Sequence, residues 1–118
     1  MNLAEAQGIL EAEVIVGSHL EEIQVRMACG ADLMSDVLAF TKKDALLLTG
    51  LTNAQVVRTG EMAEIAAICF VRGKRPSEET ISLAEENGVP LLASPLPMFE
   101  GCGRLYRAGL RGCSEVDT

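Results

Sequence analysis

Short apolar stretches separated by turn residues define the expected strands. Residues 45–48, 66–71 and 91–93 are unbroken apolar runs, and residues 13–16 differ only in beginning with a glutamate. Runs of this length, bounded by turn signals, are typical of strands buried on both faces of a parallel sheet. Residues 23–28 alternate apolar and polar side chains. This alternation predicts a fifth strand with one face in water.

Helical patterns lie between these stretches. They cover residues 2–10, residues 31 or 32 to 40, the segment after residue 53, residues 77–87, and residues 97 to about 110. Strands that alternate with such segments predict a single α/β domain, with a mostly parallel sheet of about five strands flanked by helices. We expect this domain to span residues 1–111 and residues 112–118 to form a flexible tail.

Polar residues mark several helix ends. Asn2, Ser77 and either Thr52 or Asn53 precede apolar-periodic segments and are suited to accept hydrogen bonds as N-caps. Gly88 follows the helix at residues 77–87, where a left-handed glycine is the usual stop signal.

Helical periodicity also predicts which side chains share a helix face. On the helix ending at residue 40 the expected inner face consists of Leu33, Val37 and Phe40. On the last helix one shared face carries Phe99, Cys102 and Tyr106, and a basic stripe carries Arg104, Arg107 and Arg111. Gly101 and Gly103 disfavour a helix interior, which predicts close backbone contact or a distorted start there.

Charge and cysteine content narrow the functional classes. The formal net charge of −7 disfavours nucleic-acid and anionic-membrane partners, and no apolar run approaches the ~20 residues of a membrane span. The four cysteines form no Cys-x-x-Cys pair and no signal peptide is recognisable, so we expect reduced thiols, a cytoplasmic location, and neither metal nor cofactor. The single histidine, His19, is interpreted as a surface residue rather than a catalytic base.

Residues 45–65 combine a buried strand, a short polar turn and the start of a helix. Free backbone N–H groups and the helix dipole favour an anion at such a turn. Thr49, Gly50, Thr52 and Asn53 would offer backbone and hydroxyl donors there.

Basic and hydroxyl side chains follow the neighbouring strands. Arg72 and Lys74 come after the strand at residues 66–71, Ser94 follows the last strand, and Arg58 lies one turn into the central helix. Because open α/β sheets usually bind ligands at the carboxyl ends of their strands, we expect any small ligand to be a nucleotide-like or phosphorylated anion at that edge. The alternative is that these residues only cap helices and terminate strands.

Three strings carry a resemblance to a known family. Residues 46–61 read Leu-Leu-Leu-Thr-Gly-Leu-Thr-Asn-Ala-Gln-Val-Val-Arg-Thr-Gly-Glu, residues 71–76 read Val-Arg-Gly-Lys-Arg-Pro, and residues 90–100 begin Pro-Leu-Leu-Ala-Ser-Pro. Together with residues 13–17 and 30–38 they make the chain resemble the DRTGG domain family over nearly its whole length. The naming motif Asp-Arg-Thr-Gly-Gly is present as Val-Arg-Thr-Gly-Glu at residues 57–61, with different first and last residues.

The resemblance implies a small α/β domain with a regulatory or interaction role. It is similar to the DRTGG domains fused to CBS-pair pyrophosphatases and phosphotransacetylases, and to the N-terminal domain of HPr kinase. A homodimer without chemistry of its own is the expectation that follows.

Three functions remain open from the sequence. The first is a non-enzymatic regulatory module that dimerises and binds an anion. The second is a small enzyme or accessory factor acting on phosphoryl or acyl groups, which is disfavoured because no P-loop, Gly-x-Ser-x-Gly elbow or histidine pair is present. The third is a purely structural protein partner in a larger complex.

Overall fold

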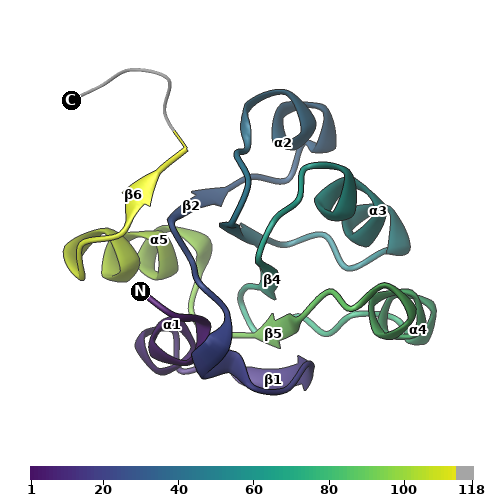
Figure 1. Ribbon diagram of the computed structural model, residues 1–118, viewed down its shortest axis with the longest axis horizontal. Coiled ribbons are helices and arrows are strands. Elements are labelled where there is room, and N and C mark those ends of the chain that lie inside the picture. Colours follow the sequence, from purple (N-terminus) through teal and green to yellow (C-terminus); the bar gives the residue numbers. More distant parts are fainter. Residues whose placement is uncertain (114–118) are drawn as a thin grey trace.

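A six-stranded sheet lies between two groups of helices (Figure 1). The structure is a computed structural model and describes residues 1–113. Its helices are α1 (Leu3–Ile9), the 3-10 helix η1 (Leu20–Glu22), α2 (Met34–Phe40), α3 (Ala54–Met62), α4 (Glu78–Asn87) and α5 (Met98–Arg107). Its strands are β1 (Glu13–Val16), β2 (Met27–Gly30), β3 (Ala45–Thr49), β4 (Ala67–Phe70), β5 (Leu91–Ala93) and β6 (Arg111–Gly112).

The strand order is β1-β5-β4-β3-β2-β6. Only β1 runs antiparallel to its neighbour, and the other four pairs are parallel. The predicted single α/β domain with a mostly parallel sheet is therefore confirmed. The sixth strand was not predicted because β6 has two residues, too few to show a periodic pattern. It places Gly112, expected in the tail, beside β2, while residues 114–118 of that tail lie outside the described part.

Alternation along β3 divides the core into two halves. Leu46 and Leu48 pack with residues of α1 and α5, while Leu47 packs with residues of α2, α3 and α4. Figure 1 shows the same division, with α1 and α5 on one side of the sheet and the other three α-helices on the opposite side. Every residue of β3 is fully buried, as predicted for a strand covered on both faces.

Side chains predicted as caps make the expected hydrogen bonds. The Asn2 Oδ1 atom accepts from the Glu5 N–H at 2.9 Å, and the Ser77 Oγ atom accepts from the Thr80 N–H at 3.2 Å. Gly88 ends α4 in the left-handed region, with a φ of 67°. These groups satisfy backbone donors and acceptors that have no partner within their own helix.

The strand predicted at residues 23–28 is wrong in position, because β2 begins at Met27. The preceding residues bind the N-terminal segment instead of the sheet: the Val25 N–H donates to the Met1 carbonyl, and the Leu3 N–H donates to the Ile23 carbonyl, both at 2.8 Å. The apolar residues of this alternating stretch that precede β2 pack with α1 instead of lying in a strand. Val25, for example, is only 1% exposed and belongs to the same core cluster as Leu3.

The predicted inner face of α2 is also wrong. On α2 only Val37 is buried, whereas Leu33 and Phe40 are more than half exposed. Leu33 is the extended N-cap residue, so it lies outside the helical turn that contacts the sheet.

On α5 the buried residues are Gly101 and Leu105, while Phe99 and Tyr106 point to solvent. The predicted arginine stripe is interrupted because α5 ends at Arg107 and Arg111 lies in β6.

The two glycines of α5 occupy different surroundings. A Cβ atom at Gly101 would lie 2.9 Å from Leu48 Cδ2 and 3.4 Å from Leu10 Cδ2, whereas a Cβ atom at Gly103 would meet nothing within 4 Å. The predicted close contact therefore exists at Gly101 and not at Gly103.

Replacing each glycine by alanine tests this contact. Both variants gain the same helix propensity, about 1 kcal/mol, so their difference isolates the crowding. We expect Gly103→Ala to stabilise the domain and Gly101→Ala to be less stable than Gly103→Ala by about 1–3 kcal/mol in urea unfolding. Equal unfolding free energies for the two variants would contradict the packing of α5 on β3.

Candidate functional site

A carboxylate is bound at the carboxyl end of β3. The Asp32 Oδ1 atom accepts a hydrogen bond from the Gly50 N–H at 2.8 Å and another from the Thr49 hydroxyl at 3.0 Å. The Thr49 oxygen also accepts from the Leu51 N–H at 3.2 Å. Asp32 follows β2, the parallel neighbour of β3, which places its carboxylate over the adjacent strand end. Two donors that the sequence suggested for a ligand therefore bind an anion from the chain itself.

Lys74 provides positive charge at the same place. A Cβ atom added to Gly50 would lie 3.5 Å from Lys74 Nζ and 3.6 Å from Asp32 Oδ1. The ammonium and the carboxylate thus lie beside the backbone of Gly50, which has no side chain of its own. We call Asp32, Thr49, Gly50 and Lys74 the β3-end cluster.

Thr52 and Asn53 connect this cluster to two helices. The Asn53 Oδ1 atom caps α3 by accepting from the Gln55 N–H at 3.0 Å. The Thr52 carbonyl accepts from the Thr80 hydroxyl at 2.8 Å, which ties the loop to the start of α4. These bonds fix the loop that precedes α3, so the cluster is supported by two helices as well as the sheet.

Three other predicted site residues have different surroundings. Ser94 is 1% exposed, and its hydroxyl donates to the Leu10 carbonyl at 2.6 Å and accepts from the Leu96 N–H at 3.1 Å. This hydroxyl joins β5 to α1 and does not face the cluster. Arg72 has a left-handed backbone, with a φ of 58°, and its N–H donates to the Leu96 carbonyl. Arg58 is exposed on α3, beside Glu61 in a separate surface depression.

A second concave region lies between α2 and α5. It is a cavity of about 530 Å³, bordered by β2 and β6 and lined mostly by apolar side chains. Phe40 of α2 and Tyr106 of α5 contribute to its wall, and so do Cys29, Cys102 and Cys113. None of these residues was predicted to form a ligand pocket.

The cavity cysteines have different acidities. A hydrogen bond with Cys113 and burial raise the pKa of the Cys29 thiol well above its ordinary value. The same hydrogen bond, together with the nearby Lys42, lowers the pKa of the Cys113 thiol to about 6. Burial raises the pKa of Cys102. Since the thiolate is the reactive form, Cys113 is the most nucleophilic of the three near neutral pH.

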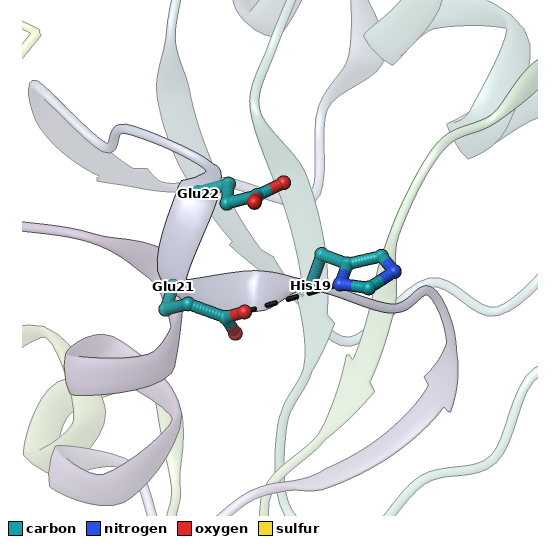
Figure 2. A group of neighbouring side chains, drawn as sticks. All are labelled: His19, Glu21 and Glu22. Carbon is teal, nitrogen blue, oxygen red and sulfur yellow. Dashed lines mark ion pairs between the residues drawn. The ribbon is translucent and has the colours of Figure 1, made fainter.

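Among residues 1–113, the only cluster with three closely spaced metal-ligand atoms is His19, Glu21 and Glu22. Figure 2 shows these side chains on one exposed turn, with His19 Nδ1 3.9 Å from Glu21 Oε1. All three are exposed, and surface carboxylates near a histidine are common without a metal. The position agrees with the interpretation of His19 as a surface residue.

The fold and the β3-end cluster define a small α/β domain with polar side chains at the carboxyl ends of its parallel strands. The model of the DRTGG domain family matches residues 5–108, and the chain belongs to that family. No helix within residues 1–113 has the length and apolar character needed to cross a bilayer.

A solved structure shares the fold. It contains the CBS and DRTGG domains of the regulatory region of Clostridium perfringens pyrophosphatase, complexed with the activator diadenosine tetraphosphate. The TM-score is 0.72 at 18% sequence identity, over 88% of this chain and 45% of that one. The present chain thus spans less than half of that regulatory region. No curated protein matches the sequence.

Sequence reasoning missed Asp32 as a member of the site. A signal was present, because Asp32 follows a strand at the same carboxyl edge as Thr49. The predicted strand ended at residue 28, so Asp32 was assigned to the start of the following helix. In the structure β2 ends at Gly30 and α2 begins at Met34, so Asp32 lies in the loop just after the strand. The cysteine-lined cavity had no such signal, because its residues come from two segments distant in sequence, β2 with α2 and α5 with β6.

The Asp32–Thr49 hydrogen bond can be measured by a double-mutant cycle. Asp32→Ala and Thr49→Val each remove one partner, and we expect each to destabilise by about 1–2 kcal/mol because the remaining group loses its partner. Since both changes remove the same bond, the double variant should be less destabilised than the sum of the two. Additive unfolding free energies would show that the two side chains do not interact.

Proposed function

We propose that this domain is a non-enzymatic regulatory module that forms a homodimer and binds a nucleotide-like or phosphorylated anion at the carboxyl ends of β3 and β4. The observation that carries the proposal is the position of Lys74 beside the bare backbone of Gly50. Family membership supports the regulatory role, because the similar pyrophosphatase regulatory region was solved with a nucleotide activator.

Asp32 determines how an anion would bind in this cluster. Its carboxylate already accepts from the Gly50 N–H and the Thr49 hydroxyl, so a phosphate cannot use those donors while Asp32 remains in place. Phosphate oxygens would therefore bind Lys74, with Arg72 as the next positive charge along the same loop. Asp32 is suited to accept hydrogen bonds from the hydroxyl or amino groups of the same ligand. This division of roles favours a nucleotide over inorganic phosphate.

Exposed apolar side chains support dimerisation through α2 and α5. Leu38 and Phe40 of α2 are 49% and 55% exposed, and Phe99 and Tyr106 of α5 are 88% and 74% exposed. Phe40 and Tyr106 also line the cavity between the two helices, which makes this apolar surface continuous with it. Apolar patches of this kind commonly mark interfaces between subunits.

A thermal-shift titration tests the ligand site. The probes are diadenosine tetraphosphate, ATP, AMP and inorganic phosphate. A ligand present at 100 times its dissociation constant should stabilise the domain by about 2.7 kcal/mol. Lys74→Ala should abolish the shift, because it removes the cation of the cluster. Asp32→Asn should enlarge the shift for phosphate, because it removes a negative charge.

Lys43→Ala is the matched control for the loss of one positive charge. Lys43 precedes β3, at the opposite edge of the sheet, and pairs with Glu64 at 3.9 Å. This variant should keep the ligand response of the unmodified domain. If none of the four probes raises the melting temperature, anion binding is refuted and the domain is better interpreted as a protein-interaction module.

Sedimentation tests the dimer. The unmodified chain should sediment as a dimer at micromolar concentration, and Phe99→Glu should shift it toward monomer because the charge would be buried at the interface. Met62→Glu is the control, since Met62 is also exposed, at 62%, but lies on α3. A monomer at all concentrations, or equal effects of both variants, would contradict an interface through α5.

A further inference from the structure

Two cysteines come directly after the paired residues of β2 and β6, which are neighbouring parallel strands. In the pairing of β2 with β6, Met27 is opposite Arg111 and Ala28 is opposite Gly112. One residue further along both chains come Cys29 and Cys113. Paired strands lie about 4.7–4.9 Å apart, a distance within the Cα separation of about 4.4–6.8 Å that a disulfide requires. The register therefore brings two cysteines to the separation of a disulfide, although 83 residues separate them in the sequence.

The two thiols also interact directly. Each is the hydrogen-bond partner of the other, and Cys29 Sγ additionally lies 3.3 Å from the Thr41 hydroxyl. Both side chains are half-buried and line the cavity between α2 and α5. The thiol pair is thus in contact and borders a concave region that a small reagent can enter.

We propose that Cys29 and Cys113 form a reversible intramolecular disulfide that fastens β6 to β2. The proposal is independent of the anion site and of the proposed regulatory function. Its co-reactant is a low-molecular-weight disulfide of the glutathione type.

The reaction proceeds by two thiol–disulfide exchanges. The Cys113 thiolate attacks one sulfur of the glutathione disulfide, forms a mixed disulfide and releases one glutathione thiolate. Cys29 then loses its proton to solvent and its sulfur attacks Cys113 Sγ, which releases the second glutathione thiolate. In total, two protein thiols are oxidised to one disulfide, and one glutathione disulfide is reduced to two thiols. The acidity of Cys113 supports its role as the first nucleophile.

The remaining cysteines are less suited to this reaction. Cys69 is fully buried in β4, and burial raises its pKa to about 12. Cys102 belongs to α5 and packs near Gly30 with the core half formed by α1 and α5, whereas Cys29 packs with the opposite half. Cys102 also shares no strand register with either member of the pair.

The disulfide would change how firmly β6 is attached to β2. β6 has two residues, and β2 is its strand partner in the sheet. A bond between Cys29 and Cys113 closes a long loop and fixes the last described residue to the sheet. It would also replace two thiols in the cavity wall by a disulfide. The redox state would thereby control the order of β6 and the shape of the cavity.

Incubation of the full chain in glutathione buffers of increasing oxidised fraction tests the proposal. Free thiols are then blocked with maleimide, and peptides are mapped by mass spectrometry without reduction. We expect a Cys29–Cys113 linked peptide within one chain, lost on reduction with dithiothreitol. Its formation should raise the melting temperature by roughly 10 °C relative to the reduced domain.

Serine variants provide the controls. Cys29→Ser and Cys113→Ser should each abolish the linked peptide and the thermal shift, while Cys102→Ser should keep both. Because the peptide map of the unmodified chain identifies the bond directly, the result does not depend on whether a variant folds. Glutathione retained on Cys113 without a second exchange, a link to Cys102, or a link between two chains would each overturn the proposal.

Discussion

Burial of β3 on both faces is the constraint on which the rest of the structure depends. Its five residues are fully buried, so the sheet must be covered by helices on both sides and β3 must have a strand on each edge. Thr49 is the one polar side chain in this strand, and it is tolerated there because its hydroxyl is hydrogen-bonded to Asp32 and Leu51. The central strand thus fixes both the layers of the fold and the first residue of the candidate site.

The carboxyl edge of the sheet combines a bound carboxylate with a neighbouring ammonium. In many α/β domains the donors at this edge bind a phosphate, but here Asp32 accepts hydrogen bonds from the Gly50 N–H and the Thr49 hydroxyl. A side chain of the domain itself therefore pairs with donors of this loop.

The β2 edge of the sheet is the second region with functional character. Its outer neighbour β6 is short, so α2 and α5 are not bridged by a full strand, and a cavity remains between them. Apolar side chains of both helices are exposed around it, and two cysteines meet in its wall. A larger β6 would cover this edge, whereas the short strand leaves it available to a second subunit and to redox reagents.

The sequence by itself determined the α/β class, four of the six strands and the helix caps, because apolar runs and cap residues act through local geometry at Asn2, Asn53 and Ser77. It placed Thr49, Gly50 and Lys74 at the carboxyl edge of the sheet, because each closely follows an apolar run that predicts a strand. Only the tertiary structure decided the position of β2, the exposure of Phe99, and the meeting of Asp32 with Gly50 and of Cys29 with Cys113. These features depend on pairing between distant segments, and such pairing leaves no periodic signal in the residues that form it.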